Sequence, residues 1–298
     1  MSERVELIRA LAVLAEEPAA EHAAVAHTLG LPNPPSPAEH TDVYVLQVYP
    51  FASVYVGAEG MMGGEARDRI AGFWRAVGQV PPTEPDHVAA LLGLYAGLLD
   101  QAERENDPAR RIMTQRAAAA LLWEHLLSWL PPFLAKLREV GSDFHREWAD
   151  LLIDVLFEES RSLDADLPLP VHLAEAPGLA EEDTLDGHLS GVLAPVRSGM
   201  VITRADLARG AVSADVGTRI GERRFILKAM LEQDVRATLR WLSSEATRWK
   251  EIHLSMGSRW GIGSNFWVQR CADAAELFTR MADSEEEQEV VLGVARSS

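Results

Sequence analysis

Apolar residues recur along this chain with the spacing of an α-helix, and this pattern limits its fold more than any other feature. Apolar residues three and four positions apart fill one face of 70–77, of 88–99 and of 144–155, as in helices that bury one side. An Ala- and Leu-rich run, 109–130, ends at Pro131–Pro132, where the missing amide hydrogen predicts a helix end. The chain is therefore expected to be all-α.

Alternation typical of a β-strand is scarce. The stretch VYVLQVY, 43–49, is the best candidate and leaves one short strand open. Helical spacing returns in the last third, where Thr203 and Asp206 resemble a capping box that starts a helix over 204–209. Longer helices are expected at 219–233, 235–254 and 265–282.

Two proline-rich stretches divide the chain. Residues 30–42 hold four prolines and predict an extended loop. Residues 161–196 hold four more, with several acids and little periodicity, which is typical of a linker. We therefore expect a helical domain over 1–160, a linker over 161–196 and a smaller helical extension over 197–298.

The charge is strongly acidic. The 298 residues include 28 Lys and Arg against 45 Asp and Glu, a net charge of −17. Such a chain repels nucleic-acid phosphates and anionic membrane surfaces, and it attracts basic partners. We therefore expect no nucleic-acid partner for the molecule as a whole.

Several classes of protein are disfavoured by what the sequence lacks. The single cysteine, Cys271, excludes an intramolecular disulfide and any Cys-rich zinc or iron–sulfur site. The acidic N-terminus does not resemble a signal peptide, and no apolar run reaches the length of a membrane span. We expect a cytoplasmic protein without stable membrane insertion.

Catalytic signatures are also missing. The chain has no nucleophile elbow, P-loop or zinc-protease motif, and its nine histidines are scattered singly. Gly261-Ile262-Gly263 begins like a dinucleotide-binding fingerprint but lacks the third glycine, so a simple turn is the better interpretation. We expect no enzyme activity, no cofactor and no metal.

The segment TEPDHVAALLGLYAGLL, 83–99, is the most informative. It can be read as a helix start, with Thr83 as N-cap, Pro85 in the first turn and Asp86 completing a capping box. That interpretation leaves His87 unexplained. An Asp–His pair on a loop at a helix N-terminus can also receive a cationic or hydrogen-bonding ligand, and the sequence leaves both interpretations open.

Glu84-Pro85-Asp86-His87 followed by an amphipathic Leu-rich helix resembles the hinge signature of the TorD/DmsD/NarJ family of chaperones. Upstream, Ser53-Val54-Tyr55, Glu59-Gly60 and Gly64 resemble the pattern that precedes a helix in this family. Residues 121–137 and 144–152 resemble its last two helices. The likeness covers roughly 40–160, so the extension after the linker has no counterpart in it.

This resemblance implies a TorD-like helical bundle and a function. Family members bind the twin-arginine signal peptide and the apo form of a molybdopterin-dependent oxidoreductase catalytic subunit. They assist cofactor insertion and proofread export, and they do not catalyse. The candidate signal-peptide-binding residues are Tyr55, Phe73, Trp74, Glu84, Pro85, Asp86, His87 and Tyr95.

The residue types suit a basic, apolar peptide. Glu84 and Asp86 can accept hydrogen bonds from arginine, and the aromatic residues offer apolar area. Phe73 and Trp74 are adjacent in a helix and point about 100° apart, so we expect one to pack inward and the other to line the groove. The sequence does not decide whether His87 reports pH or bonds the peptide.

A runner-up interpretation is a transcriptional regulator, because 204–231 loosely resembles a helix-turn-helix, although an ordinary helical hairpin is favoured.

Residues 197–250 carry eleven basic and six acidic residues, a local charge of +5. Docking on the first domain, wrapping the client and forming a homodimer are all open roles for the extension.

Overall fold

The computed structural model describes residues 2–163, 167–181, 185–260 and 263–296. They are helical with no β-strand, so the expected all-α class is confirmed. The chain divides into two compact units, one of Met1–Gly57 with Met61–Ala174 and one of Ala58–Gly60 with Glu175–Ser298. No helix in the described part of the chain is both long and apolar enough to cross a bilayer.

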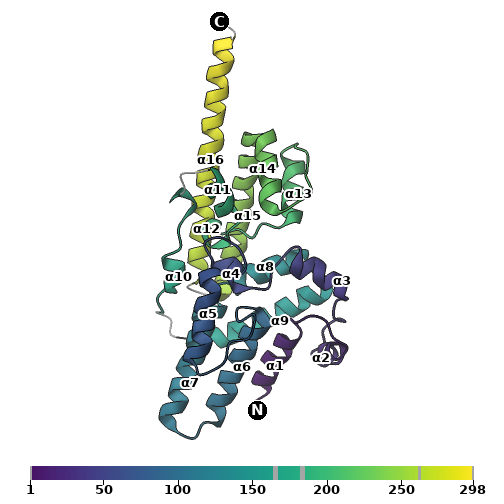
Figure 1. Cartoon of the computed structure of the whole chain (residues 1–298), viewed down its shortest axis with the longest axis vertical. Helices are drawn as coiled ribbons and strands as arrows, with labels where there is room; N and C mark the ends of the chain where they lie inside the picture. Colours follow the sequence, from purple (N-terminus) through teal and green to yellow (C-terminus); the bar gives the residue numbers. More distant parts are fainter. Residues whose placement is uncertain (1, 164–166, 182–184, 261–262, 297–298) are drawn as a thin grey trace. The chain divides into compact units, whose positions relative to one another are not determined.

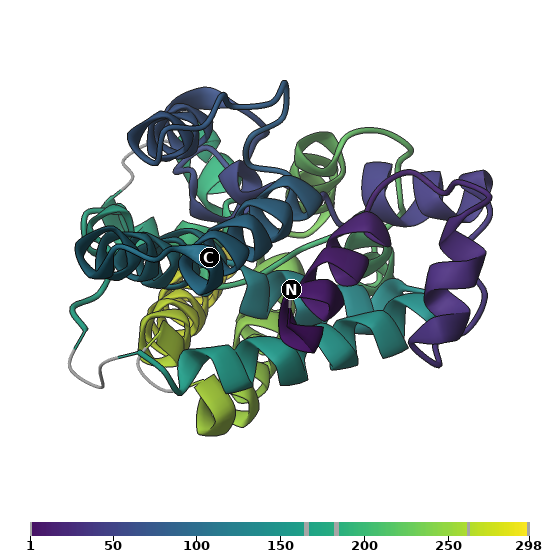
Figure 2. The same ribbon diagram turned by 90° about the horizontal axis from the view of Figure 1, so that it is seen from below.

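The first unit is a bundle built around α6 (Val88–Arg104). Helices α1 (Glu3–Val13) and α7 (Pro108–Ala120) pack against α6, and α1 also contacts α9 (Asp143–Ser160) (Figures 1 and 2). The remaining elements of this unit are α2 (His22–Thr28), α3 (Pro37–His40), η1 (Thr41–Val45), α4 (Ala52–Val56), α5 (Gly64–Ala76), η2 (Leu121–Leu126), α8 (Leu130–Val140) and α10 (Val171–Ala174).

Aromatic side chains form the core of this bundle. Trp129, Phe133 and Trp148 are fully buried. The indole nitrogen of Trp129 donates to the His125 carbonyl at 2.7 Å, and that of Trp148 donates to the Leu11 carbonyl at 3.1 Å. Each buried indole N–H therefore has a partner, as buried donors require.

A polar cluster joins three helices of the same bundle. Glu159 on α9 is nearly buried, pairs with Arg4 on α1 and accepts a hydrogen bond from the Tyr95 hydroxyl on α6. Burial and the nearby Glu159 carboxylate raise the pKa of Tyr95, so this hydroxyl stays protonated and keeps donating.

Two local expectations are corrected. The strand left open over 43–49 is absent, because the chain forms the π-helical turn η1, which buries Val43 and Tyr44. The helical run over 109–130 ends at Leu126, before the proline pair. Pro131 and Pro132 lie in the first turn of α8, where no amide donor is required.

The second unit is organised by two long helices, α15 (Val235–Trp260) and α16 (Gly263–Arg296), which pack against each other. Thr203 and Asp206 form the expected capping box at the start of α13. The other elements are η3 (Leu179–Glu181), α11 (Leu185–Val192), α12 (Pro195–Ser198), α13 (Arg204–Ser213) and α14 (Arg223–Gln233). Gly261 and Ile262, where a turn is expected, lie outside the described residues.

The stretch expected as a linker, 161–196, contains short helices. Leu173, Leu179 and Leu189 are buried, because each short piece is anchored by its own leucine. The helix-turn-helix interpretation is not supported, since residues 214–222 connect α13 to α14 and the turn of that motif has about three to four residues.

Gly60 is fixed by close packing within the second unit. Its φ is +63°, and a Cβ atom there would lie 2.7 Å from the Ala194 Cα. Both observations require glycine at this position. The Glu59-Gly60 motif therefore serves the packing of the second unit.

Candidate functional site

Two sequence motifs of the first unit run side by side just before the helices that they start. The Ala52 amide donates to the Asp86 carbonyl at 2.9 Å, and the Val88 amide donates to the Pro50 carbonyl at 2.9 Å. These bonds form an isolated antiparallel bridge between Phe51 and His87. The SVY and EPDH motifs, more than thirty positions apart in the sequence, are thus one structural element.

Asp86 is 2% exposed and links the two motifs through its side chain. Its carboxylate accepts a hydrogen bond at 3.1 Å from the amide of Ser53, which lies in the first turn of α4. The expected capping box led by Thr83 is wrong, because α6 begins at Val88. Asp86 instead caps the N-terminus of α4 from a distant part of the chain.

His87 is the N-cap of α6. Its Nδ1 accepts a hydrogen bond from the Ala89 amide at 3.2 Å, and its ring lies edge-on to Phe51 at 5.0 Å between centroids. Burial lowers the pKa of His87 to about 4, against the opposing effect of Asp86. His87 is therefore neutral near pH 7 with its proton on Nε2, since Nδ1 acts as an acceptor.

Helix α5 fixes the loop that leads to these residues. The Trp74 indole donates to the Pro85 carbonyl at 3.1 Å, and Arg67 donates to the Thr83 carbonyl at 2.8 Å. Phe73 lies edge-on to His125 at 4.9 Å between ring centroids. Phe73 and Trp74 are both half-buried, but they face different neighbours: Phe73 contacts the buried His125, and Trp74 lines a cavity.

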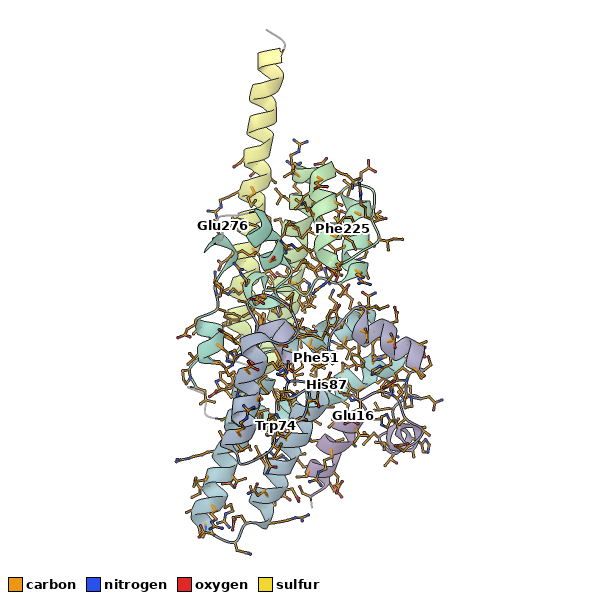
Figure 3. All side chains as sticks on the ribbon, in the orientation of Figure 1. Glu16, Phe51, Trp74, His87, Phe225 and Glu276 are labelled. Atoms are coloured by element: carbon orange, nitrogen blue, oxygen red, sulfur yellow. The ribbon has the colours of Figure 1, made fainter. Side chains whose placement is uncertain are left out.

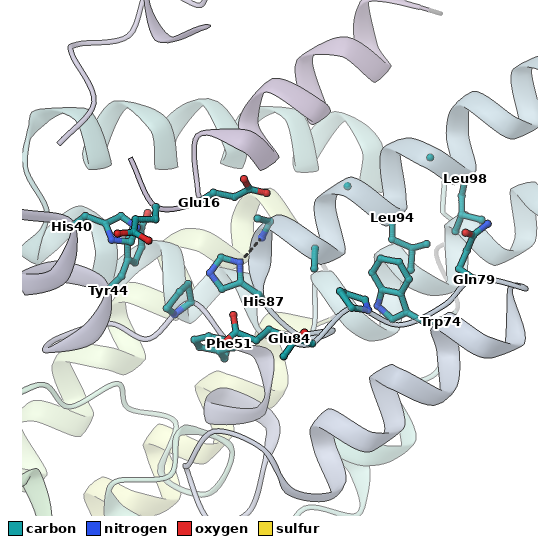
Figure 4. A pocket seen from close by; sticks show the side chains of 18 of the residues that line it. Glu16, His40, Tyr44, Phe51, Trp74, Gln79, Glu84, His87, Leu94 and Leu98 are labelled. Carbon is teal, nitrogen blue, oxygen red and sulfur yellow. Dashed lines mark hydrogen bonds between the residues drawn. The ribbon is translucent and has the colours of Figure 1, made fainter. Parts of the chain in front are cut away.

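This cavity has a volume of about 880 Å³ and lies along α6 (Figure 4). Ala90, Gly93 and Gly97 form a strip of small residues on its α6 side. A Cβ atom at either glycine would meet nothing within 4 Å, so both glycines face open space. The other lining residues are Glu16, Glu17, His40, Tyr44, Val45, Pro50, Phe51, Trp74, Gln79, Pro82, Thr83, Glu84, His87, Ala89, Leu94, Leu98 and Gln101.

The charge of the lining is entirely negative. Glu16, Glu17 and Glu84 are exposed carboxylates, and no lysine or arginine is among the described residues that line the cavity. Glu16 and Glu84 lie on opposite sides of His87 (Figure 4). Further along the cavity, Leu94 of α6 lies near Trp74 of α5. The same region is seen within the whole chain in Figure 3. An apolar wall beside carboxylates suits a ligand that is both basic and apolar.

The structure brings together only part of the expected set. Trp74, Glu84 and His87 line the cavity, while Asp86 and Pro85 are buried behind it. Two other candidates belong to the core. Tyr55 is 1% exposed between Trp129 and Phe133, and Tyr95 is 2% exposed against Glu159. Neither tyrosine offers surface to a ligand in this cavity.

Sequence reasoning missed several residues of the lining. Glu16 and Glu17 lie just after α1 in a region without family likeness, and only their acidity hinted at a role. The repeated small residues Ala90, Gly93 and Gly97 on an otherwise leucine-rich helix were a signal for a hollow face.

Comparison with known proteins bears on this region. Residues 37–135 match the family model described as "Nitrate reductase delta subunit". The predicted family resemblance is confirmed over this stretch, which ends before the expected limit near 160. The matched stretch includes η1, α4, α5, α6 and η2, and therefore most of the cavity. This NarJ/TorD-like family consists of molybdoenzyme maturation chaperones and is not a catalytic family.

The match leaves 136–298 uncovered, including the whole extension expected over 197–298. No curated protein and no solved structure matches the chain. Within the described residues no group of three or more His, Cys, Asp or Glu side chains is placed to hold a metal ion.

Proposed function

We propose that the acidic cavity along α6 binds the twin-arginine signal peptide of a molybdopterin-dependent oxidoreductase subunit. The chain would hold the apo form of this subunit in the cytoplasm, assist cofactor insertion and proofread export. The observation that carries the proposal is the composition of the cavity, in which Glu16, Glu17 and Glu84 stand beside an apolar wall with no lysine or arginine.

A signal peptide of this class has arginines followed by an apolar stretch. The guanidinium groups would pair with the exposed carboxylates around His87, where each Arg–carboxylate contact is a charge-assisted hydrogen bond. The apolar stretch would lie along Ala90, Gly93 and Gly97, flanked by Trp74 and Leu94. The neutral His87 retains an Nε2–H with which it can donate to a peptide carbonyl.

Isothermal titration calorimetry of the full chain with a synthetic twin-arginine peptide tests the proposal. Replacing Glu84 by Gln removes one charge from an exposed position, so we expect the affinity to fall several-fold with the fold intact. Replacing Glu147, an exposed carboxylate on α9 outside the cavity, by Gln is the matched control. Equal affinities of Glu84→Gln, Glu147→Gln and the unaltered chain would overturn the proposal.

A further inference from the structure

Helix α7 carries positive charge that is not neutralised within its own bundle. It contains Arg110, Arg111 and Arg116 and no acidic residue. All three side chains are exposed, and none of them forms an ion pair with another residue that the structure describes. Each guanidinium group is therefore free to bind a carboxylate from another molecule.

The acidic residues that precede α7 are engaged in other hydrogen bonds. The Glu103 carboxylate accepts from the Ser2 hydroxyl at 2.6 Å, and the Glu105 carboxylate accepts from the Asp107 amide at 2.9 Å. Asp107 itself caps α7 by accepting from two backbone amides of its first turn. These carboxylates thus hold the start of the helix and leave its arginine side chains unpaired.

The exposed side of α7 is apolar as well as basic. Ile112 and Met113 are 49% and 70% exposed. Arg116 lies four positions after Ile112 and three after Met113, so these side chains share one face of the helix. Arg110 borders the same face, three positions before Met113. The face combines cationic and apolar groups, which are the two properties that the cavity along α6 is suited to bind.

A chain cannot bring this face of α7 to its own cavity. Gly93 and Gly97 of α6 line the large cavity, whereas Tyr95 and Leu99 line a separate cavity beside α7. At about 100° per residue, these two pairs lie on opposite sides of α6. Helix α7 packs against the side of α6 that faces away from the large cavity (Figure 1). Only a second molecule can present its α7 there.

The cavity is open to such a helix. Glu16, Glu17 and Glu84 are exposed, and within the described ranges none of the three forms an ion pair. Gly93 and Gly97 leave open space along α6, where a Cβ atom would meet nothing within 4 Å. Glycine permits the close approach of another backbone. Unpaired carboxylates thus stand beside a helical surface that a second helix can approach.

We propose that α7 of one molecule binds in the cavity along α6 of a second copy of this chain. Arg110 and Arg116 pair with carboxylates of the cavity, and Ile112 and Met113 lie along its apolar wall. This inference rests on the proposed function, because α7 then occupies the peptide site and a twin-arginine peptide displaces it. Self-association therefore masks the cavity until a signal peptide is present.

Net charge opposes this contact only at long range. Two chains of charge −17 repel each other, but exposed charges are screened beyond about 8–10 Å at physiological salt. At contact, the arginines of α7 meet the carboxylates of the cavity. Because the two surfaces differ, the contact is heterologous, and each can be altered without changing the other.

Sedimentation velocity of the full chain at physiological salt tests the proposal. We expect concentration-dependent self-association, which an excess of synthetic twin-arginine peptide reverses. Arg116→Glu should weaken the association about tenfold, or about 1.4 kcal/mol. Arg75→Glu is the matched control with the same change in net charge. Arg75 is an exposed arginine of α5 that does not line the cavity and has no ion pair with a described residue.

Mixing two variants separates the two halves of the contact. Glu84→Arg alters the cavity and keeps α7, whereas Arg116→Glu alters α7 and keeps the cavity. Each variant alone should associate weakly. Their mixture should form a one-to-one dimer, through the intact α7 of the first and the intact cavity of the second.

Several outcomes would overturn the proposal. They are association that a bound peptide does not reverse, equal weakening by Arg116→Glu and Arg75→Glu, a mixture that forms no dimer, and a chain that stays monomeric. Calorimetry with the peptide reports separately on the proposed function. A monomeric chain that binds the peptide retains that function, whereas an associating chain that binds no peptide retains only the α7 contact.

Discussion

The Asp86 carboxylate connects two motifs that lie far apart in the sequence. It is buried, and it accepts from the Ser53 amide in the first turn of α4. A carboxylate at a helix N-terminus stabilises the helix through the exposed amides and the helix dipole. In the EPDH motif, Asp86 therefore stabilises the residues that line the cavity, while its own carboxylate is buried and does not line it.

Replacing Asp86 by Ala should lower the free energy of unfolding by about 1–3 kcal/mol, because the buried Ser53 amide would lose its partner. Urea unfolding followed by circular dichroism measures the change. Asp68→Ala, at an exposed position on α5, should change stability by less than about 0.5 kcal/mol. Similar losses for the two variants would contradict the capping role of Asp86.

The low pKa of His87 predicts how the stability of the fold changes with pH. Burial lowers its folded-state pKa to about 4, whereas an unfolded histidine titrates near 6.5. Between these values the unfolded chain binds a proton that the folded chain does not. The stability that His87 contributes is therefore complete above about pH 6.5 and is lost as the pH falls toward 4.

His87→Asn retains a capping acceptor without the titration. The stability difference between the unaltered chain and this variant should thus change with pH by up to about 1.4 kcal/mol per unit in that window. Urea midpoints measured from pH 7 to pH 4.5 would show it. A difference that stays constant across this range would contradict a neutral, half-buried His87.

At the scale of single elements, α6 shows what periodicity can and cannot predict. Its apolar spacing predicts a helix over 88–99, and the observed helix is Val88–Arg104. The first residue of α6 could not be predicted from the local sequence. His87 is the N-cap because the residues before it are held by distant parts of the chain, Asp86 by the Ser53 amide of α4 and Pro85 by the Trp74 indole. Capping rules that consider only neighbouring residues do not include such long-range hydrogen bonds.

The same limit applies to the site. Trp74 and Glu84 could be selected because their types match the ligand chemistry, and both line the cavity. Tyr55 and Tyr95 were selected on the same grounds, yet both are buried. Aromatic residues serve cores and surfaces alike, so only tertiary structure separates these roles.

Substitutions at Gly93 of α6 should change both stability and peptide affinity. Gly93→Ala should stabilise the helix by about 0.5–1 kcal/mol, because alanine is the better helix former and its Cβ meets no other atom. Gly93→Leu should extend into the cavity and weaken the twin-arginine peptide at least several-fold by calorimetry. Gly72→Leu, at an unobstructed position on α5 outside the cavity, is the control and should leave affinity unchanged.

For the whole molecule, net charge governs how a basic peptide is attracted. The acidic cavity lies on a chain of charge −17. Exposed charges are screened beyond a Debye length of about 8–10 Å at physiological salt. The affinity for a twin-arginine peptide should therefore fall as salt is raised, as measured by calorimetry. A flat response would show that the carboxylates around the cavity do not contribute to binding.

The packing of Gly60 in the second unit leads to a stability prediction. Gly60→Ala combines a positive φ with a clash against the Ala194 backbone, and it should destabilise the second unit by about 2 kcal/mol or more. Gly30→Ala also places alanine at a positive φ, +72°, but meets open space around the Cβ, so its loss should be smaller. Differential scanning calorimetry of both variants measures the two contributions.

The membership of Ala58–Gly60 in the second unit has a consequence for synthesis on the ribosome. The chain grows from its N-terminus at about 5–20 residues per second. Residues 58–60 therefore leave the exit tunnel on the order of ten seconds before their partner Ala194 is translated. During that interval Gly60 lacks its packing partner, so its native contacts form only after Ala194 emerges.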